Sequence, residues 1–128
     1  MAFDVVISHF RNTTSSPLLK MVIQGTTGTG KYYLIYCSKY ALQTPCEQSG
    51  CVLLLLAPTG VAAFNIRAST IHSALRIPIG EMQPLEGQSL SKLQEELRHI
   101  RYILIDEMRF IGPKMLTQID ARLCQAFP

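Results

Sequence analysis

The chain has 128 residues, of which 48% are hydrophobic and 16% are charged, a balance that excludes an intrinsically disordered protein and allows at most one domain. Its net charge of +3 permits nucleic-acid binding, but no basic run demands it. The amino-terminus lacks a signal-peptide pattern and the apolar run at 52–57 is too short to cross a bilayer, so we expect a soluble, intracellular protein without a membrane partner.

The predicted elements alternate between helices and strands. Phe3, Val6, Ile7 and Phe10 recur at helical spacing and predict a short amphipathic helix, followed by a polar breaker at 11–17. We predict strands at 18–24, 51–57 and 102–105. Strands that alternate with helices indicate an α/β fold, with a parallel sheet flanked by helices and right-handed crossovers.

The predicted helices lie between and after these strands. They comprise a helix at 31–42, short turns at 62–64 and 71–75, a helix at 90–100 and a last helix from 113. Leu90, Leu93, Leu97 and Ile100 form a core-facing stripe, and Ser91 with Gln94 is a possible capping box. In the last helix, Leu116, Ile119 and Leu123 are expected to face inward, and the Pro- and Gly-bearing loop at 76–88 to be exposed.

The four cysteines form no C-x-x-C pair and have no histidine at zinc spacing; they are Cys37, Cys46, Cys51 and Cys124. Free thiols in a reducing compartment are therefore expected, and Cys46 with Cys51 as metal ligands is the weaker alternative.

A glycine-rich segment directly after the first predicted strand fits the phosphate-binding loop G-x-x-x-x-G-K-[ST] in all but its last position. Its residues, predicted to bind the cofactor, are Gly25, Thr26, Thr27, Gly28, Thr29, Gly30, Lys31 and Tyr32. Glycines let backbone N–H groups approach a polyphosphate, the following helix adds its positive end, and Lys31 would reach the β- and γ-phosphates. The alternative is an ordinary glycine-rich turn between strand and helix.

The third strand ends in Asp106-Glu107, at the edge where ligands of parallel sheets bind. Behind a phosphate-binding loop, the Asp is expected to hold the Mg²⁺ shell and the Glu to orient or deprotonate the attacking water. Consecutive strand residues point to opposite faces, so the two carboxylates can take different tasks. Solvated acids at a strand end are the alternative.

Three blocks of the chain together resemble the petite-integration-frequency (PIF-type) DNA helicases of superfamily one, especially the fungal and Helitron-like forms. The blocks are residues 25–31, the pair Ala57–Ala63 and Thr70–Leu75, and Ile105–Met108. The resemblance implies a RecA-like P-loop NTPase that uses ATP and Mg²⁺ to move 5′-to-3′ along single-stranded DNA. Roles in repair, recombination and telomere maintenance, and a nuclear location, come with it.

The resemblance assigns catalytic roles to Lys31, Asp106 and Glu107, with the metal on Asp106. It places single-stranded DNA near Pro58, Thr59, Gly60 and His72, where a hydroxyl and backbone N–H groups can contact phosphates without reading sequence. Without the family, a Pro-Thr-Gly helix cap and a turn histidine are the favoured interpretations of these residues.

The chain departs from the family pattern at several positions. Tyr32 stands where a small hydroxyl residue binds Mg²⁺, Ala68 where glycine is usual, and Arg109 where serine follows the acidic pair; no glutamine takes the adenine-reading place, since Gln24 abuts the loop. We expect residues 1–128 to be an incomplete first lobe, with a helix and linker at 1–17 and without the second motor lobe. The oligomeric state is not determined by the sequence.

Three hypotheses follow from this pattern. The first is a truncated helicase segment with little or no unwinding activity, because translocation requires two lobes. The second is a catalytically degenerate nucleotide-binding module in which Tyr32 disturbs the metal. The third is a chain that does not fold stably, since an interrupted parallel sheet leaves an edge uncovered.

Overall fold

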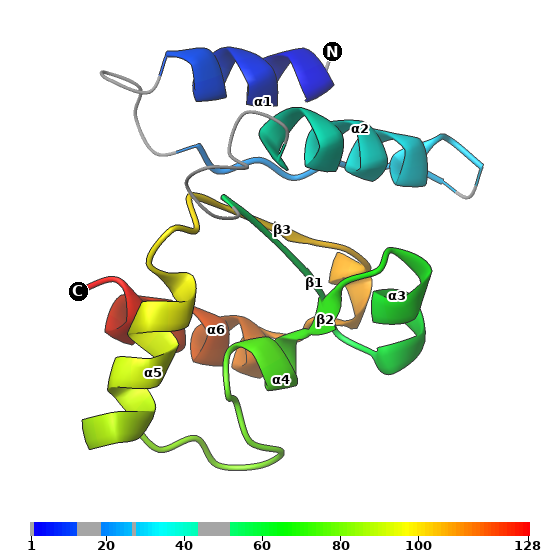
Figure 1. Cartoon of the computed structure of the whole chain (residues 1–128). Coiled ribbons are helices and arrows are strands. Elements are labelled where there is room, and N and C mark those ends of the chain that lie inside the picture. Colours follow the sequence, from blue (N-terminus) through cyan, green and yellow to red (C-terminus); the bar gives the residue numbers. More distant parts are fainter. Residues whose placement is uncertain (1, 13–18, 27, 44–51) are drawn as a thin grey trace. The chain divides into compact units, whose positions relative to one another are not determined.

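A computed structural model describes residues 2–12, 19–26, 28–43 and 52–128 (Figure 1). The chain divides into two compact units, Met1–Gly50 and Cys51–Pro128.

The described residues of the first unit form helices α1 (Ala2–Arg11) and α2 (Lys31–Gln43). The predicted amphipathic helix is confirmed as α1, which has Asp4 in its first turn and His9 and Arg11 in its last, as the helix dipole favours. Helix α2 begins at the predicted residue and ends one residue later than predicted. Ile35, Ser38 and Leu42 are buried along one side of α2, whereas its tyrosines are exposed: Tyr32, Tyr33, Tyr36 and Tyr40.

The strand predicted at 18–24 is wrong over the residues that the structure describes, since 19–24 have no regular secondary structure. Met21, Val22 and Ile23 are 38%, 61% and 41% exposed. An apolar run becomes a strand only when a neighbouring strand takes up its N–H and C=O groups. The described sheet lies wholly in the second unit and does not include this segment.

The second unit is built on three parallel strands in the order β2-β1-β3. They are β1 (Leu53–Ala57), β2 (Ser69–Thr70) and β3 (Tyr102–Ile105). Strand β1 is central, with Leu56 opposite Ile105 on one side and Ser69 on the other. The predicted parallel α/β class is therefore confirmed. Strand β2 was not predicted, because its two polar residues form no strand pattern.

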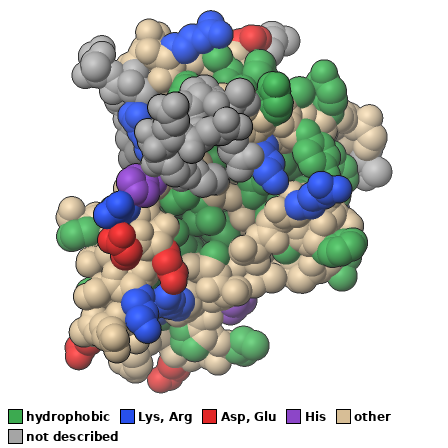
Figure 2. Space-filling view, viewed as in Figure 1, with side chains coloured by type: hydrophobic (Ala, Val, Ile, Leu, Met, Phe, Trp, Pro, Cys, Tyr) green, Lys and Arg blue, Asp and Glu red, His purple; other side chains and the backbone are tan. Residues whose placement is uncertain are grey.

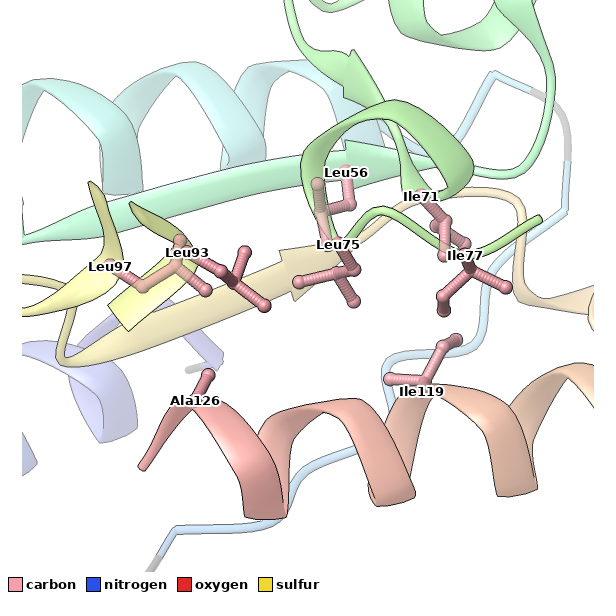
Figure 3. Close-up of a cluster of buried hydrophobic side chains, with 8 residues drawn as sticks. All are labelled: Leu56, Ile71, Leu75, Ile77, Leu93, Leu97, Ile119 and Ala126. Carbon is pink, nitrogen blue, oxygen red and sulfur yellow. The ribbon is translucent and has the colours of Figure 1, made fainter. Parts of the chain in front are cut away.

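Helices α4 (Ile71–Ala74), α5 (Gly87–Leu97) and α6 (Pro113–Ala126) contribute to the main core, while α3 (Gly60–Asn65) and the 3₁₀ helix η2 (Met108–Phe110) follow β1 and β3. Figure 3 shows the core side chains converging between the sheet and α6. The buried members of this core are Leu56, Ile71, Leu75, Ile77, Leu93, Leu97, Ile119 and Ala126. Burying such side chains contributes roughly 1.5–3 kcal/mol each, so this core stabilises the sheet from one face.

Two details of the prediction for α5 and α6 are wrong. The capping box fails because α5 begins earlier, at Gly87, so that Ser91 lies inside the helix and bonds the Gly87 carbonyl. Gln94 instead donates to the Gln125 carbonyl on α6. Leu116 is 52% exposed, because the face of α6 that packs on the core is set by Ile119 and Ala126.

The loop at 76–88 is not simply exposed, because one buried arginine ties it to α6. Arg122 is 1% exposed; its terminal nitrogens donate to Gln125 Oε1 at 2.7 Å and to the carbonyls of Arg76 and Gln83 at 3.2 and 3.3 Å. Gln125 in turn exchanges two hydrogen bonds with the backbone of Leu85. Burial lowers the pKa of Arg122. We call this set the Arg122 clamp.

The surface over α5 carries charges of both signs. Figure 2 shows acidic and basic side chains interspersed there, in line with the ion pairs Arg76–Glu96 at 2.8 Å and Arg98–Glu95 at 3.1 Å. In the part of the chain that the structure covers, none of the helices combines the length and apolar character that crossing a bilayer requires. Cys37 and Cys124 are free thiols, as predicted, whereas Cys46 and Cys51 lie outside the described residues.

Candidate functional site

The glycine-rich loop ends at the first residue of α2 and is closed by its own side chains. Thr29 donates its hydroxyl to the Thr26 carbonyl at 2.7 Å. Gly25 lies so close to this hydroxyl that an added Cβ would come within 2.5 Å of Thr29 Oγ1, so a larger residue there would require the Thr29 side chain to move. Gly28 and Gly30 have φ of 81° and 83°, which favours glycine at both positions. Thr27 lies outside the described residues.

Lys31 points back into this loop. Its ammonium donates to the carbonyl oxygen of Gly25 and lies 3.4 Å from that of Thr26. A cation on the curve of a glycine-rich loop, with the N-terminal end of a 13-residue helix beside it, is an arrangement that fits a phosphate group. The predicted helix after the loop is confirmed, although the preceding strand is not formed.

Tyr32 is the second residue of α2 and is 46% exposed. Its ring separates the hydroxyl from the helix start, where a serine or threonine oxygen would lie, and Mg²⁺ takes ligands at about 2.0–2.1 Å in octahedral order. Tyr32 therefore does not fit the metal-binding position of the loop. At the next residue, a hydrogen bond with Cys37, one turn further along the helix, raises the pKa of Tyr33.

A second group of candidate residues directly follows the carboxyl ends of the three strands, wholly within the second unit. We call this side of the sheet, with the segments that leave the strands there, the carboxyl edge. Asp106 follows β3, and its N–H donates to the Leu56 carbonyl of β1 at 3.0 Å. Among the described residues, its Oδ2 is buried and has no hydrogen-bond partner. A buried carboxylate oxygen without a donor is costly unless a cation or water satisfies it, so Asp106 fits a Mg²⁺ ligand.

Glu107 has a left-handed backbone, with φ of 55° and ψ of 46°. The prediction that strand alternation separates the two carboxylates is wrong, because β3 ends at Ile105 and the chain turns at Glu107. The Glu107 Oε2 accepts a hydrogen bond from Arg109 Nε at 3.1 Å. The Arg109 guanidinium also lies over the Phe110 ring, 5.1 Å from its centroid.

The predicted DNA-contacting residues follow the two strands beside β3. Thr59 caps α3: its Oγ1 accepts from Ala62 N at 3.2 Å. The helix-cap interpretation is thus confirmed for Thr59, an exposed residue whose hydroxyl still has a proton to donate. Gly60 is exposed and begins α3, and Pro58 is partly buried. His72 lies in the short helix α4 directly after β2 and is partly buried.

The sheet register explains why these residues share the carboxyl edge. Ala57 pairs with Thr70, and Leu56 pairs with Ile105, so the segments that leave all three strands emerge together (Figure 1). Sequence patterns gave no role to two residues of this edge. Thr70 caps α4 by accepting from Ser73 N at 3.2 Å, and the T-x-x-S spacing was the available signal. Arg109 stood out only as a departure.

Within the described residues, no three His, Cys, Asp or Glu side chains cluster as a metal site built from protein ligands alone would require. A parallel sheet flanked by helices, with acidic residues at its carboxyl edge and a glycine-rich loop before a helix elsewhere in the chain, is the architecture of part of a RecA-like α/β domain.

The family model described as PIF1-like helicase matches residues 2–127. The ATP-dependent DNA helicase PIF5 of Trypanosoma brucei brucei (strain 927/4 GUTat10.1) is 32% identical over 104 residues, which cover 78% of this chain and 11% of that protein. No solved structure matches the chain. Because the family match extends over nearly all of its residues, the chain belongs to the PIF1-like helicase family, while it spans only about a tenth of that relative's length.

Proposed function

We propose that the chain supplies part of the first RecA-like lobe of an ATP-dependent DNA helicase. The observation that carries this proposal is the glycine-rich loop, in which two left-handed glycines and the Lys31 ammonium meet at the start of α2. Lys31 would hold the β- and γ-phosphates of ATP. Asp106, whose buried oxygen has no donor among the described residues, would hold the Mg²⁺ shell, and Glu107 would orient the attacking water.

Single-stranded DNA is the proposed track. Thr59 and Gly60 are exposed residues at the carboxyl edge, and the hydroxyl of the first and the backbone N–H of the second can contact phosphate oxygens whatever the base sequence. Movement in the 5′-to-3′ direction and roles in repair, recombination and telomere maintenance are proposed from the family alone. When bound, Mg²⁺ would neutralise charge that develops on the phosphate oxygens.

Titration of labelled ATP with and without Mg²⁺ tests the proposal. We expect binding that Mg²⁺ strengthens and that Lys31→Ala weakens at least tenfold, since one charge-assisted contact to phosphate is worth about 1.5–3 kcal/mol. Lys39→Ala, on the same helix but outside the loop, is the matched control and should bind as the unmodified chain does. Equal loss in both variants, or binding that ignores Mg²⁺, would contradict the proposal.

A second candidate is a nucleotide-binding module without hydrolysis, and the position of Tyr32 favours it. If the ring displaces the metal, Tyr32→Ser should restore hydrolysis of bound ATP, while Tyr33→Ser, one residue along the same helix, should not. In a strand-displacement assay we expect little or no unwinding by this chain, because unwinding needs two lobes that move against each other. Robust unwinding would refute that expectation.

A further inference from the structure

The most unusual feature of the carboxyl edge is the contact between Arg109 and Glu107. The proposed water-orienting carboxylate does not stand alone: a guanidinium two residues away donates to it, from the Nε edge, at 3.1 Å. We propose that Arg109 is a positioning residue that exchanges Glu107 for a backbone phosphate of single-stranded DNA. Bound DNA would thereby release the carboxylate.

Exposure makes this exchange inexpensive. The Arg109 side chain is 74% exposed and that of Glu107 27%. Ion pairs of this kind are worth only about 0–1 kcal/mol, because water screens both charges. A phosphate, which accepts two parallel hydrogen bonds from an arginine, is the stronger competitor.

The geometry leaves the right part of the side chain available. Only the Nε edge of Arg109 bonds Glu107, and among the described residues its two terminal nitrogens have no hydrogen-bond partner. The Phe110 ring beneath the guanidinium, 5.1 Å from Cζ to centroid, holds its plane in place. A fork of two donors is thus presented outward at a fixed position.

The sheet topology supplies the reason for choosing DNA as the occupant. Strands β1 and β3 are neighbours, with Leu56 opposite Ile105. The turn Pro58–Gly60 and the turn Glu107–Arg109 therefore leave adjacent strands at one edge, and a strand of DNA that follows the first turn passes the second. This step rests on the proposed function, which places DNA at Thr59 and Gly60.

Release would matter because the hydrogen bond from Arg109 holds one oxygen of the Glu107 carboxylate, so that only a freed side chain can turn toward an attacking water. Glu107 is restrained while it is paired with Arg109, and it can reorient once a phosphate has taken its place on the guanidinium. The exchange would couple DNA binding to the orientation of the Glu107 carboxylate without any movement of the sheet.

A double-mutant cycle on DNA affinity tests the exchange without depending on ATP hydrolysis. The probe is a labelled oligothymidine of about 20 nucleotides, long enough to span one site, followed by fluorescence anisotropy at several salt concentrations. Glu107→Gln should tighten binding about three- to fivefold by freeing Arg109. Arg109→Ser should weaken it by a similar factor and make the salt slope shallower by about one. The double variant should match Arg109→Ser.

Matched controls come from the exposed ion pairs of α5. Glu96→Gln removes the same charge from a carboxylate that pairs with Arg76, and Arg98→Ser removes an exposed arginine that pairs with Glu95. Both should change affinity by less than about 1.5-fold. Arg109→Lys, which keeps the charge but not the fork, should fall between the unmodified chain and Arg109→Ser.

Several results would overturn the exchange. They are an effect of Glu107→Gln no larger than that of Glu96→Gln, additive effects in the cycle, or no binding of the oligonucleotide by the unmodified chain. In a separate experiment, the same variants are titrated with Mg²⁺-ATP in the absence of DNA. If coupling between Glu107 and Arg109 appears only in that experiment, the phosphate that Arg109 binds belongs to a nucleotide, and DNA is rejected as the occupant. If the chain failed to bind ATP while the double-mutant cycle on DNA affinity gave the expected result, the ATPase proposal would be rejected and the exchange would stand.

Discussion

Two regions of the second unit hold arginines in opposite ways, and the contrast separates what stabilises the fold from what equips the site. In the Arg122 clamp, a guanidinium that is 1% exposed donates to oxygens of Gln125, Arg76 and Gln83. At the carboxyl edge, Arg109, whose side chain is 74% exposed, donates to Glu107, while Asp106 keeps a buried oxygen that has no donor among the residues that the structure describes.

The difference shows where the chain meets its hydrogen-bonding requirements. Buried polar groups cost about 1–3 kcal/mol each when unpaired, so a clamp that satisfies most of them fixes the loop at 76–86 onto α6. An edge that places a residue in a left-handed turn, and an oxygen out of reach of any donor in the described part of the chain, gives up some stability at that point. Such departures from local preference are common at functional sites.

The largest expected effect comes from breaking the clamp. Arg122→Ala should lower the free energy of unfolding by about 3 kcal/mol, because it empties a buried volume and leaves two backbone carbonyls without donors. The midpoint of urea unfolding measures this loss. Arg98→Ala, an exposed arginine paired with Glu95, should cost no more than about 0.5 kcal/mol. Equal shifts in both variants would show that the clamp does not stabilise the unit.

A smaller effect is expected at the cap of α3. Thr59→Ala should lower the free energy of unfolding by about 1 kcal/mol, since the hydroxyl that accepts from Ala62 N is lost, and it should also weaken oligonucleotide binding. Thr59→Ser keeps the oxygen and should preserve both properties. Thr117→Ala, which removes an exposed hydroxyl bonded within α6, is the control and should change neither. Unchanged DNA affinity in Thr59→Ala would limit Thr59 to its capping role.

Sequence patterns predicted the core of the second unit well because its signals are local. The unbroken apolar run at 53–57 and the helical stripe of Leu93 and Leu97 each require only a few neighbouring residues to be recognised. The strand predicted at 18–24 failed for the opposite reason. Its apolar residues were read correctly, but pairing depends on a partner far away in the chain.

The candidate site was predictable in its residues and not in its geometry. The spacing of Gly25 to Lys31 and the acidic pair after β3 are the sequence signals on which the proposed chemistry rests. No pattern predicted the left-handed turn at Glu107, because it is set by how the chain leaves the sheet. The Arg122 clamp was also missed. Its acceptors include the backbone carbonyls of Arg76 and Gln83, which precede Arg122 by 46 and 39 positions. Every residue has such a carbonyl, so no sequence pattern marks these two.

The smallest predicted effect concerns the strain at the carboxyl edge. A non-glycine residue in a left-handed conformation costs about 1 kcal/mol, and both Glu107 (φ 55°) and Arg67 (φ 51°) carry that cost. Arg67→Gly should therefore raise the free energy of unfolding by about 1 kcal/mol. Glu107→Gly should raise it by a smaller amount, because it also loses the exposed pair with Arg109.

The two glycine variants should differ in function. Arg67→Gly should leave hydrolysis of ATP as it is in the unmodified chain, whereas Glu107→Gly should abolish it, since no carboxylate remains to orient water. Chemical denaturation and an ATPase assay on the same preparations check both outcomes. If Glu107→Gly lowered stability while Arg67→Gly raised it, the ion pair would be holding the turn in place. Arg109 would then be a structural brace, and the contrast with the Arg122 clamp would vanish.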